Sequence, residues 1–417
     1  MERSIIAGIF KPEQHKYEID YILEEVKLLA ESAGSEVYDL FYQKRKSCDK
    51  KYLIGKGKVL EIKKLINLKN IDLIVFYNYL NNTQQRNLED YFKIKVIDRT
   101  RLILDIFATR AKSIEGRLQV ELAQLLYLLP RLTGKGVELS RLGGGIGTRG
   151  PGETKLEVDR RRIKKRISVL KKRLVKVIKN RDVQRKGRKS YPVPVVSLVG
   201  YTSAGKSTLF KQLTSEDVQI SEKLFSTLDP LLRRVSLGEI ETGYYFLLSD
   251  TVGFIRDMPG ELLQSFRATF EDMVQSDIIL HIVDVSNSEH LDQKREVEEI
   301  LEYINISNIK VVTVYNKIDL LEDYSSFLNQ SDKKGIFISA KENIGILKLK
   351  KIIFNKYFKD YERYMIAIPE NLFNINSIRK WSIIVNQSKK DGLIYIDVLS
   401  SKKKMIKFKQ RYGGYVK

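Results

Sequence analysis

Short apolar runs alternate with helically spaced apolar positions through the first quarter of the chain. The short runs are typical of strands and lie at residues 4–10, 36–41, 71–76 and 95–97. Between them, apolar residues recur every three or four positions over residues 19–33, 58–67 and 84–92. This alternation predicts an α/β unit with a mainly parallel sheet over residues 1–112.

Two longer stretches carry leucine and isoleucine at helical spacing, with a glycine-rich segment between them. The first has leucine at positions 118, 122, 125 and 129 and ends at Pro130. The second has an apolar residue at positions 163, 167, 170, 174 and 177, a stripe of the coiled-coil type. Six of the ten residues from 143 to 152 are glycine, which excludes a regular element there. Residues 113–190 are therefore predicted to form a helical hairpin with a glycine-rich tip.

The rest of the chain shows apolar runs that end in loops rich in glycine and polar residues. Such runs occupy residues 193–199, 244–249, 311–314 and 335–338. Because strand, loop and helix in succession are typical of parallel sheets, residues 191–360 are predicted to form a second α/β domain. Residues 361–417 are predicted to be a small tail, with strands at 382–385 and 392–399.

Composition narrows the class of protein without identifying it. The chain has 417 residues, 43% of them hydrophobic, and can bury the cores of two or three domains. Its longest apolar stretches, such as 71–75 and 278–285, are shorter than the roughly 20 residues of a membrane-spanning helix. Cys48 is the only cysteine, and the first residues lack an apolar signal segment. We expect a cytoplasmic monomer without disulfides that meets membranes at most peripherally.

Positive charge is concentrated beside the predicted tip. The formal net charge is +22, and residues 156–190 alone contain 16 Lys or Arg and 3 Asp or Glu. Such an excess indicates a polyanionic partner, either nucleic acid or an anionic membrane surface. The alternative is a solvated basic helix packed on its own protein. The concentration of charge favours nucleic acid, and the candidate contacts are Arg141, Arg149, Arg160, Arg161, Arg162, Lys164 and Lys165.

A phosphate-binding loop follows the apolar run 193–199. Residues 200–207 read Gly-Tyr-Thr-Ser-Ala-Gly-Lys-Ser, which fits G-x-x-x-x-G-K-[ST], and a helix is predicted next. Glycines let consecutive backbone N–H groups face phosphate oxygens, and the helix adds its dipole. Lys206 is predicted to reach the β- and γ-phosphates, and the Ser207 hydroxyl to bind Mg²⁺. The predicted contacts are Gly200, Tyr201, Thr202, Ser203, Ala204, Gly205, Lys206, Ser207 and Thr208.

Two further segments suit a γ-phosphate and its Mg²⁺ ion. Asp250 ends an apolar run, where a carboxylate can hold Mg²⁺ directly or through water, and the Gly253 N–H can approach the γ-phosphate. Thr227 lies close to Phe225, between the phosphate loop and Asp250. This position suits a switch threonine, which closes on Mg²⁺ when the γ-phosphate is present. An ordinary loop threonine is the alternative. The predicted catalytic residues are Lys206, Thr227 and Gly253.

Two later segments predict guanine as the base. In Asn316-Lys317-Ile-Asp319, the Asp319 carboxylate can accept from both N1–H and the exocyclic amine of guanine, a donor pair that adenine lacks. Asn316 can contact the other edge of the base, and Lys317 can cover its face or brace the loop. Ser339-Ala340-Lys341 can offer a backbone N–H to guanine O6. The four segments together predict a GTPase that converts GTP to GDP and phosphate, rather than an ATPase.

Phe254 occupies the position after Gly253, where a glutamine orients the attacking water in well-characterised GTPases. Because phenylalanine cannot orient water, we expect slow intrinsic hydrolysis that a partner or another element accelerates. Arg256 and Arg149 are candidates to supply a cation to the transition state, with surface ion pairs as the alternative.

These segments, together with residues 116–130, 143–162 and 265–269, resemble the HflX-type translational GTPases of the Obg-HflX-like group in the TRAFAC class. The likeness covers about residues 1–360, and the run 143–162 carries it most specifically because ordinary small GTPases lack it. The implied fold has an N-terminal α/β domain with a helical hairpin. A P-loop GTPase domain with a doubly wound, mainly parallel sheet and a small C-terminal α+β tail follow.

The resemblance also implies a partner. HflX-type GTPases bind the large ribosomal subunit near the peptidyl-transferase region, with the N-terminal domain and its loop directed at rRNA. They split ribosomes, notably stalled ones, and members also bind ATP through the N-terminal domain, at a site that the residues of this chain do not mark. Two alternatives stay open: a GTPase that acts in ribosome assembly or on another RNA complex, and a nucleotide-gated RNA-binding module with negligible turnover.

Ser203 departs from the family pattern, which has asparagine at this position of the phosphate loop. In related GTPases that asparagine helps to hold a monovalent cation. The departure puts K⁺ stimulation in question for this chain.

Overall fold

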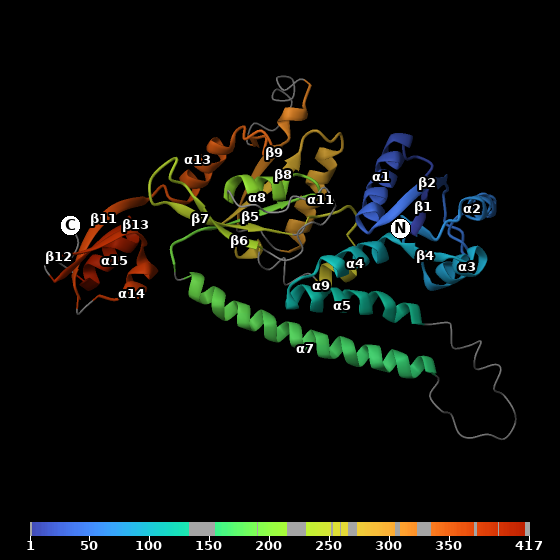
Figure 1. The fold of residues 1–417 in the computed structure, drawn as a ribbon, viewed down its shortest axis with the longest axis horizontal. Coiled ribbons are helices and arrows are strands. Elements are labelled where there is room, and N and C mark those ends of the chain that lie inside the picture. Colours follow the sequence, from blue (N-terminus) through green and yellow to red (C-terminus); the bar gives the residue numbers. More distant parts are fainter. Residues whose placement is uncertain are drawn as a thin grey trace, which may run out of the picture. The chain divides into compact units, whose positions relative to one another are not determined.

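The computed structural model describes residues 2–132, 155–189, 191–214, 231–251, 253–258, 260–265, 273–304, 309–322, 335–370, 373–390 and 392–412. These residues form two compact units (Figure 1). The first unit runs to residue 176 and also contains residues 258–265, and the second contains the remainder. Within the described ranges, no helix is long and apolar enough to cross a membrane.

A four-stranded parallel sheet organises the first unit. Its order is β2-β1-β3-β4, with β1 (Glu2–Phe10), β2 (Ser35–Lys44), β3 (Leu73–Phe76) and β4 (Lys95–Asp98). The accompanying helices are α1 (Lys16–Ser32), α2 (Lys56–Lys69), α3 (Asn82–Phe92) and α4 (Arg99–Arg110). Strand β3 is buried at every position, as expected for a parallel strand covered on both faces. The predicted α/β unit is confirmed.

Helices α5 (Ile114–Leu128) and α7 (Lys155–Lys189) lie side by side and confirm the predicted helical hairpin (Figure 1). A short 3₁₀ helix, η1 (Leu129–Leu132), follows α5. Of the nine apolar positions that the helical spacing singled out, the seam buries Leu122, Ile167, Leu170 and Leu174, with Leu118, Leu125, Leu129 and Ile163 packed against them. The ninth, Val177, is half-buried. The glycine-rich tip lies outside the described residues.

Helix α9 (Gly260–Ser265) belongs to the first unit, although its sequence lies within the segment predicted to form the nucleotide domain. It packs on α5, and its Leu262 side chain is fully buried. Residues 258–265, a few positions after Gly253, are therefore part of the same unit as α5.

The second unit contains a six-stranded sheet in the order β10-β9-β8-β5-β7-β6. The strands are β5 (Val195–Gly200), β6 (Leu231–Ser236), β7 (Tyr245–Asp250), β8 (Ile278–Asp284), β9 (Lys310–Asn316) and β10 (Ile336–Phe337). Only the edge pair β6–β7 is antiparallel among the pairs described. The helices are α8 (Lys206–Thr214), α11 (His290–Tyr303), η2 (Ile318–Leu320) and α13 (Ile346–Tyr357). Because the parallel strands share a direction, the motif-bearing loops meet at one edge.

A three-stranded antiparallel sheet follows in the second unit. Its order is β11-β13-β12, with β11 (Tyr361–Pro369), β12 (Ile383–Lys390) and β13 (Leu393–Ser401), and α14 (Ile375–Trp381) and α15 (Lys402–Tyr412) accompany it. Its core includes Ile366, Ile396, Met405 and Phe408. The predicted α+β tail is confirmed, and β11, α14 and α15 are additions that the sequence pattern did not single out.

Candidate nucleotide-binding site

The phosphate loop connects β5, which ends at Gly200, to α8, which begins at Lys206. Two positions of the loop require glycine, because neighbouring atoms leave no room for a Cβ. A Cβ added to Gly200 would lie 2.3 Å from the Ile282 carbonyl oxygen, and one added to Gly205 would lie 2.2 Å from Asn316 Nδ2. The loop therefore fits tightly between β8 and the base-recognition segment.

The Lys206 side chain contacts the backbone of the phosphate loop. Its Nζ donates to the carbonyl oxygens of Gly200, at 3.1 Å, and Tyr201, at 2.6 Å. Burial lowers the pKa of Lys206 to about 8, and the neighbouring Asp250 carboxylate opposes this shift. The ammonium group thus lies where the motif needs a cation for phosphate oxygens.

Ser207 and Asp250 place a hydroxyl and a carboxylate next to each other. Ser207 Oγ lies 3.4 Å from Asp250 Oδ2, and Asp250 is almost completely buried. The other carboxylate oxygen accepts from the Thr251 N–H at 3.0 Å, which fixes the orientation of the group. The structure brings these two predicted Mg²⁺ ligands together, whereas Phe225 and Thr227 lie outside the described residues.

The segment after Asp250 runs against the phosphate loop. A Cβ added to Gly253 would lie 3.0 Å from Lys206 Nζ, so Gly253 borders the phosphate-binding lysine. Phe254 is 1% exposed. Arg256, a candidate for transition-state stabilisation, pairs instead with Glu296 at 3.2 Å.

The side-chain amide of Asn316 connects the phosphate loop to the loop at residues 339–341. Asn316 Nδ2 donates to the Ala204 carbonyl oxygen at 2.9 Å, and its Oδ1 accepts from the Ala340 N–H at 3.0 Å. Lys317 pairs with Asp284 at 2.5 Å, which braces the loop. Asp319 is exposed, so its carboxylate is accessible to a base. The Asn316 contact was not predicted, because a side chain that links three distant segments leaves no local pattern.

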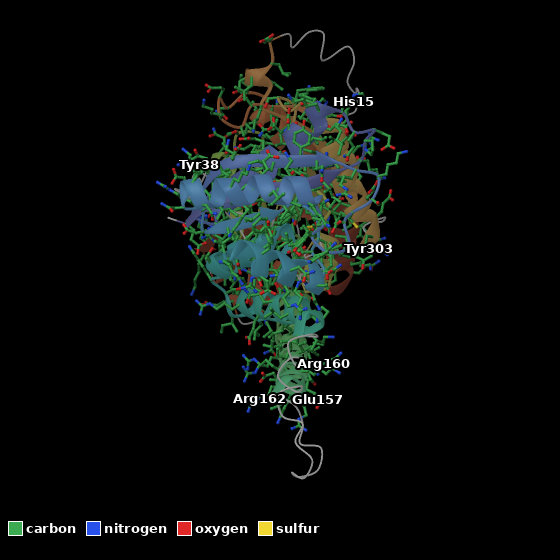
Figure 2. The ribbon with its side chains drawn as sticks, turned by 90° about the vertical axis from the view of Figure 1, so that its right-hand side faces the viewer. His15, Tyr38, Glu157, Arg160, Arg162 and Tyr303 are labelled. Carbon is green, nitrogen blue, oxygen red and sulfur yellow. The ribbon has the colours of Figure 1, made fainter. Side chains whose placement is uncertain are left out.

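The predicted RNA contacts on α7 are exposed. Figure 2 shows Arg160 and Arg162 directed outward near one end of this helix. Arg162 lies 3.7 Å from Asp159, and the neighbouring Arg166 makes a bidentate contact with Glu121 of α5 at 2.6 and 2.9 Å. The side chains that are also exposed include Arg161, Lys164 and Lys165, whereas Arg141 and Arg149 lie outside the described residues.

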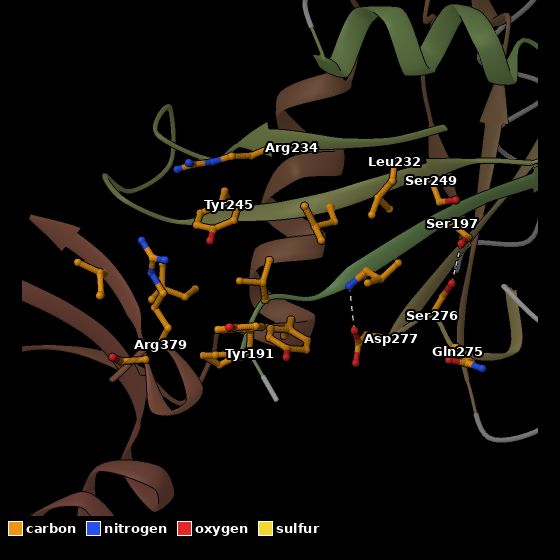
Figure 3. Close-up of a pocket in the computed structure, with 18 of the residues that line it drawn as sticks. Tyr191, Ser197, Leu232, Arg234, Tyr245, Ser249, Gln275, Ser276, Asp277 and Arg379 are labelled. Atoms are coloured by element: carbon orange, nitrogen blue, oxygen red, sulfur yellow. Dashed lines mark hydrogen bonds between the residues drawn. The ribbon is translucent and has the colours of Figure 1, made fainter. Parts of the chain in front are cut away.

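A cleft of about 1010 Å³ lies at the other end of β5 within the second unit (Figure 3). Val195, which begins β5, lines it together with Tyr245 and Arg379. Arg234 covers the Tyr245 ring at 3.8 Å. The phosphate loop follows the opposite end of the same strand, so this cleft is separate from the nucleotide site.

Three family models match the chain. Residues 20–108 match the GTP-binding GTPase N-terminal model, residues 110–188 match the GTP-binding GTPase middle region, and residues 195–317 match the 50S ribosome-binding GTPase model. With the loops assembled at one edge of the sheet, these matches define a P-loop GTPase that binds guanine nucleotides and hydrolyses GTP.

Curated relatives identify the family. GTPase HflX of Caldanaerobacter subterraneus subsp. tengcongensis is 46% identical over 88% of this chain and 83% of its own length. GTPase HflX of Escherichia coli strain K12 is 40% identical over 83% of this chain and 82% of its own length. The chain therefore belongs to the HflX family of GTPases.

Solved structures of GTP-binding proteins are also similar to the chain. A GTP-binding protein from the archaeon Sulfolobus solfataricus, in complex with GDP, is 25% identical with a TM-score of 0.46, over 86% of this chain and 99% of that one. The complex of SsGBP with GDP is 24% identical with a TM-score of 0.50 over the same shares. The second likeness shows the fold.

Proposed function

We propose that this HflX-family GTPase binds the large ribosomal subunit in its GTP-bound state and splits ribosomes, including stalled ones. The observation that carries the proposal is the exposed basic face of α7. In support, the family model that matches residues 195–317 is described as a 50S ribosome-binding GTPase. Both point to a ribonucleoprotein partner.

The α7 face suits contacts with phosphate groups. Within the described part of the chain, Arg160, Lys164 and Lys165 are exposed and make no ion pair. The apolar seam with α5 holds the helix on its other side, so these cations are carried by a packed scaffold. Cations with no partner of their own can neutralise phosphates without breaking an existing pair, which favours binding through counterion release.

Ser207 and Asp250 fit a Mg²⁺ ion, which prefers oxygen ligands and commonly takes few of them from the protein. When bound, the ion would supply positive charge that neutralises the phosphate groups and the charge that develops in the transition state. We propose that Ser207 and Asp250 hold it, with Thr227 as a third contact. Asp250 is buried and fixed by the Thr251 N–H, so its carboxylate needs little rearrangement to bind.

We assign guanine recognition to Asp319, with support from the loop that contains Lys341. The Ala340 N–H already donates to Asn316 Oδ1, so the adjacent N–H of Lys341 is the one we assign to guanine O6. Asn316 then acts mainly by tying the phosphate loop to the base loops. The exposed Asp319 carboxylate provides the contact that distinguishes guanine from adenine.

The surroundings of Phe254 support slow intrinsic hydrolysis. The phenylalanine is buried, and Arg256 is held in an ion pair with Glu296. Neither side chain is placed to orient water or to neutralise transition-state charge. We propose that the ribosome supplies or positions the missing group.

Single-turnover hydrolysis of GTP, with and without purified ribosomal subunits, tests this proposal. We expect large subunits to raise the rate of GTP hydrolysis by about tenfold or more over the rate of the protein alone. A tenfold rise corresponds to roughly 1.4 kcal/mol of additional transition-state stabilisation. Small subunits are the matched control. If large subunits leave the rate unchanged, the chain is better described as a nucleotide-gated binding module.

A further inference from the structure

Tyr201 connects the phosphate loop to the segment that follows Gly253. The residue is 4% exposed, and its hydroxyl oxygen accepts from the Arg256 N–H at 2.7 Å. The side chain of Tyr201 therefore contacts residues 253–258, the switch segment, and its backbone carbonyl accepts from Lys206 Nζ. One residue of the loop contacts both the phosphate-binding lysine and the switch.

Two backbone hydrogen bonds flank this contact. The Thr202 N–H donates to the Phe254 carbonyl oxygen at 2.7 Å, and the Phe254 N–H donates to the Gly200 carbonyl oxygen at 3.1 Å. Tyr201 and Phe254 thus form a parallel bridge between the two segments. The Tyr201 hydroxyl adds a contact with Arg256, two residues after Phe254. The Arg256 side chain in turn pairs with Glu296 of α11.

Gly253 is fixed by this arrangement. It immediately precedes the bridge, and an added Cβ would lie 3.0 Å from both Lys206 Nζ and Thr202 Cγ2. The neighbouring Asp257 has a left-handed conformation (φ 46°), and the chain enters the first unit at residue 258. Arg256 is consequently among the last residues of the switch segment that the second unit holds.

We infer that Tyr201 is a positioning residue for GTP hydrolysis: its hydroxyl holds residues 253–256 on the phosphate loop, so that the Gly253 N–H is in place when the γ-phosphate binds. Preorganised donors stabilise a transition state because they need no reorganisation as charge develops. GDP has no γ-phosphate. The hydroxyl therefore contributes to hydrolysis and to GTP binding but not to GDP binding.

The substitution Tyr201→Phe removes the hydroxyl and keeps the buried ring. We expect kcat for intrinsic GTP hydrolysis to fall about fivefold, the effect of one ordinary hydrogen bond, with GDP affinity unchanged. The measurements are single-turnover hydrolysis over a range of GTP concentrations and titration of the full-length protein with a fluorescent GDP. Glu296→Gln, which weakens the second anchor of Arg256, is expected to give the same pattern with a smaller amplitude.

Tyr244→Phe is the matched control, because Tyr244 is a buried tyrosine of the same unit that immediately precedes β7 and packs against Phe354 and Phe358. It is expected to change neither quantity. A Tyr201→Phe variant that hydrolyses GTP at the original rate or faster would overturn the inference. So would an equal loss of affinity for GDP and GTP with kcat unchanged, since that result describes a residue that only supports the loop.

Discussion

Lys206 combines a buried position with a charge that the nucleotide requires. Its Nζ is satisfied by two carbonyl oxygens of the loop, yet burial depresses its pKa to about 8. Phosphate groups beside it favour the ammonium form and raise the pKa in the complex. Nucleotide binding and protonation of Lys206 are consequently linked.

This linkage predicts a pH dependence of GDP binding. Below pH 8 the free protein already carries the Lys206 proton, so binding takes up little. Above pH 8 the free protein loses it, and binding takes up a proton, so GDP affinity falls as the pH rises, approaching tenfold per unit. Calorimetric titrations at pH 7 and pH 9, each in two buffers of different ionisation enthalpy, count the protons. Equal uptake at both pH values would contradict the assignment.

Asp319 is the residue on which base choice depends. We expect Asp319→Asn to weaken GTP binding by about tenfold or more, because an amide nitrogen faces the guanine amine and leaves polar groups unpaired. Xanthine carries an oxygen in place of that amine, so the variant is expected to bind XTP better than the original protein does. Competition of GTP and XTP against a fluorescent GDP measures both changes. Unchanged GTP affinity would refute the base assignment.

The positions of residues in the candidate site could be predicted from the sequence where they depend on short spacing. The phosphate loop, Asp250 and Asp319 are read from motifs whose residues act close to their own strand ends. The Tyr201–Arg256 contact and the Asn316 bridge were not, because each depends on the direction of a side chain across the gap between two loops.

At the scale of elements, α5 and α7 form a scaffold with one packed side and one basic side. Leu170 is fully buried in the seam, while Lys164 and Lys165 are exposed. The helical period predicted this arrangement because the spacing of apolar residues sets which face is buried. The helical spacing does not predict that α9, a short helix from a distant part of the sequence, packs on α5.

The basic face of α7 is tested by neutralising three cations together. Arg160→Gln, Lys164→Gln and Lys165→Gln keep good helix formers and leave the seam intact. We expect weaker ribosome binding and a slope of log affinity against log salt that is shallower by about 2 to 3, if each residue contacts one phosphate.

The matched control replaces three exposed lysines of α13, namely Lys348, Lys351 and Lys356, with glutamine. It removes the same net charge from another helix and is expected to leave most of the slope unchanged. An equal change in both triple variants would mean that net charge, rather than the α7 face, governs binding.

At the scale of the molecule, more than one segment of the chain passes between the two units. Helix α7 runs from the first unit into the second, and the switch segment passes from the second unit into the first after Asp257. The basic face lies in the first unit, and the segment after Gly253 enters the same unit at residue 258 and continues into α9, which packs on α5. We propose that GTP binding, through Gly253 and the segment that leads to α9, sets the state in which the hairpin binds RNA.

Sedimentation through sucrose gradients tests the central claim most directly. The full-length protein is mixed with ribosomes in the presence of a non-hydrolysable GTP analogue or of GDP, and its position is followed across the gradient. The account predicts that with the analogue the protein travels with large subunits and the fraction of joined ribosomes falls, whereas with GDP it stays near the top. A protein that stays at the top with both nucleotides, or that travels only with incompletely assembled particles, would contradict it.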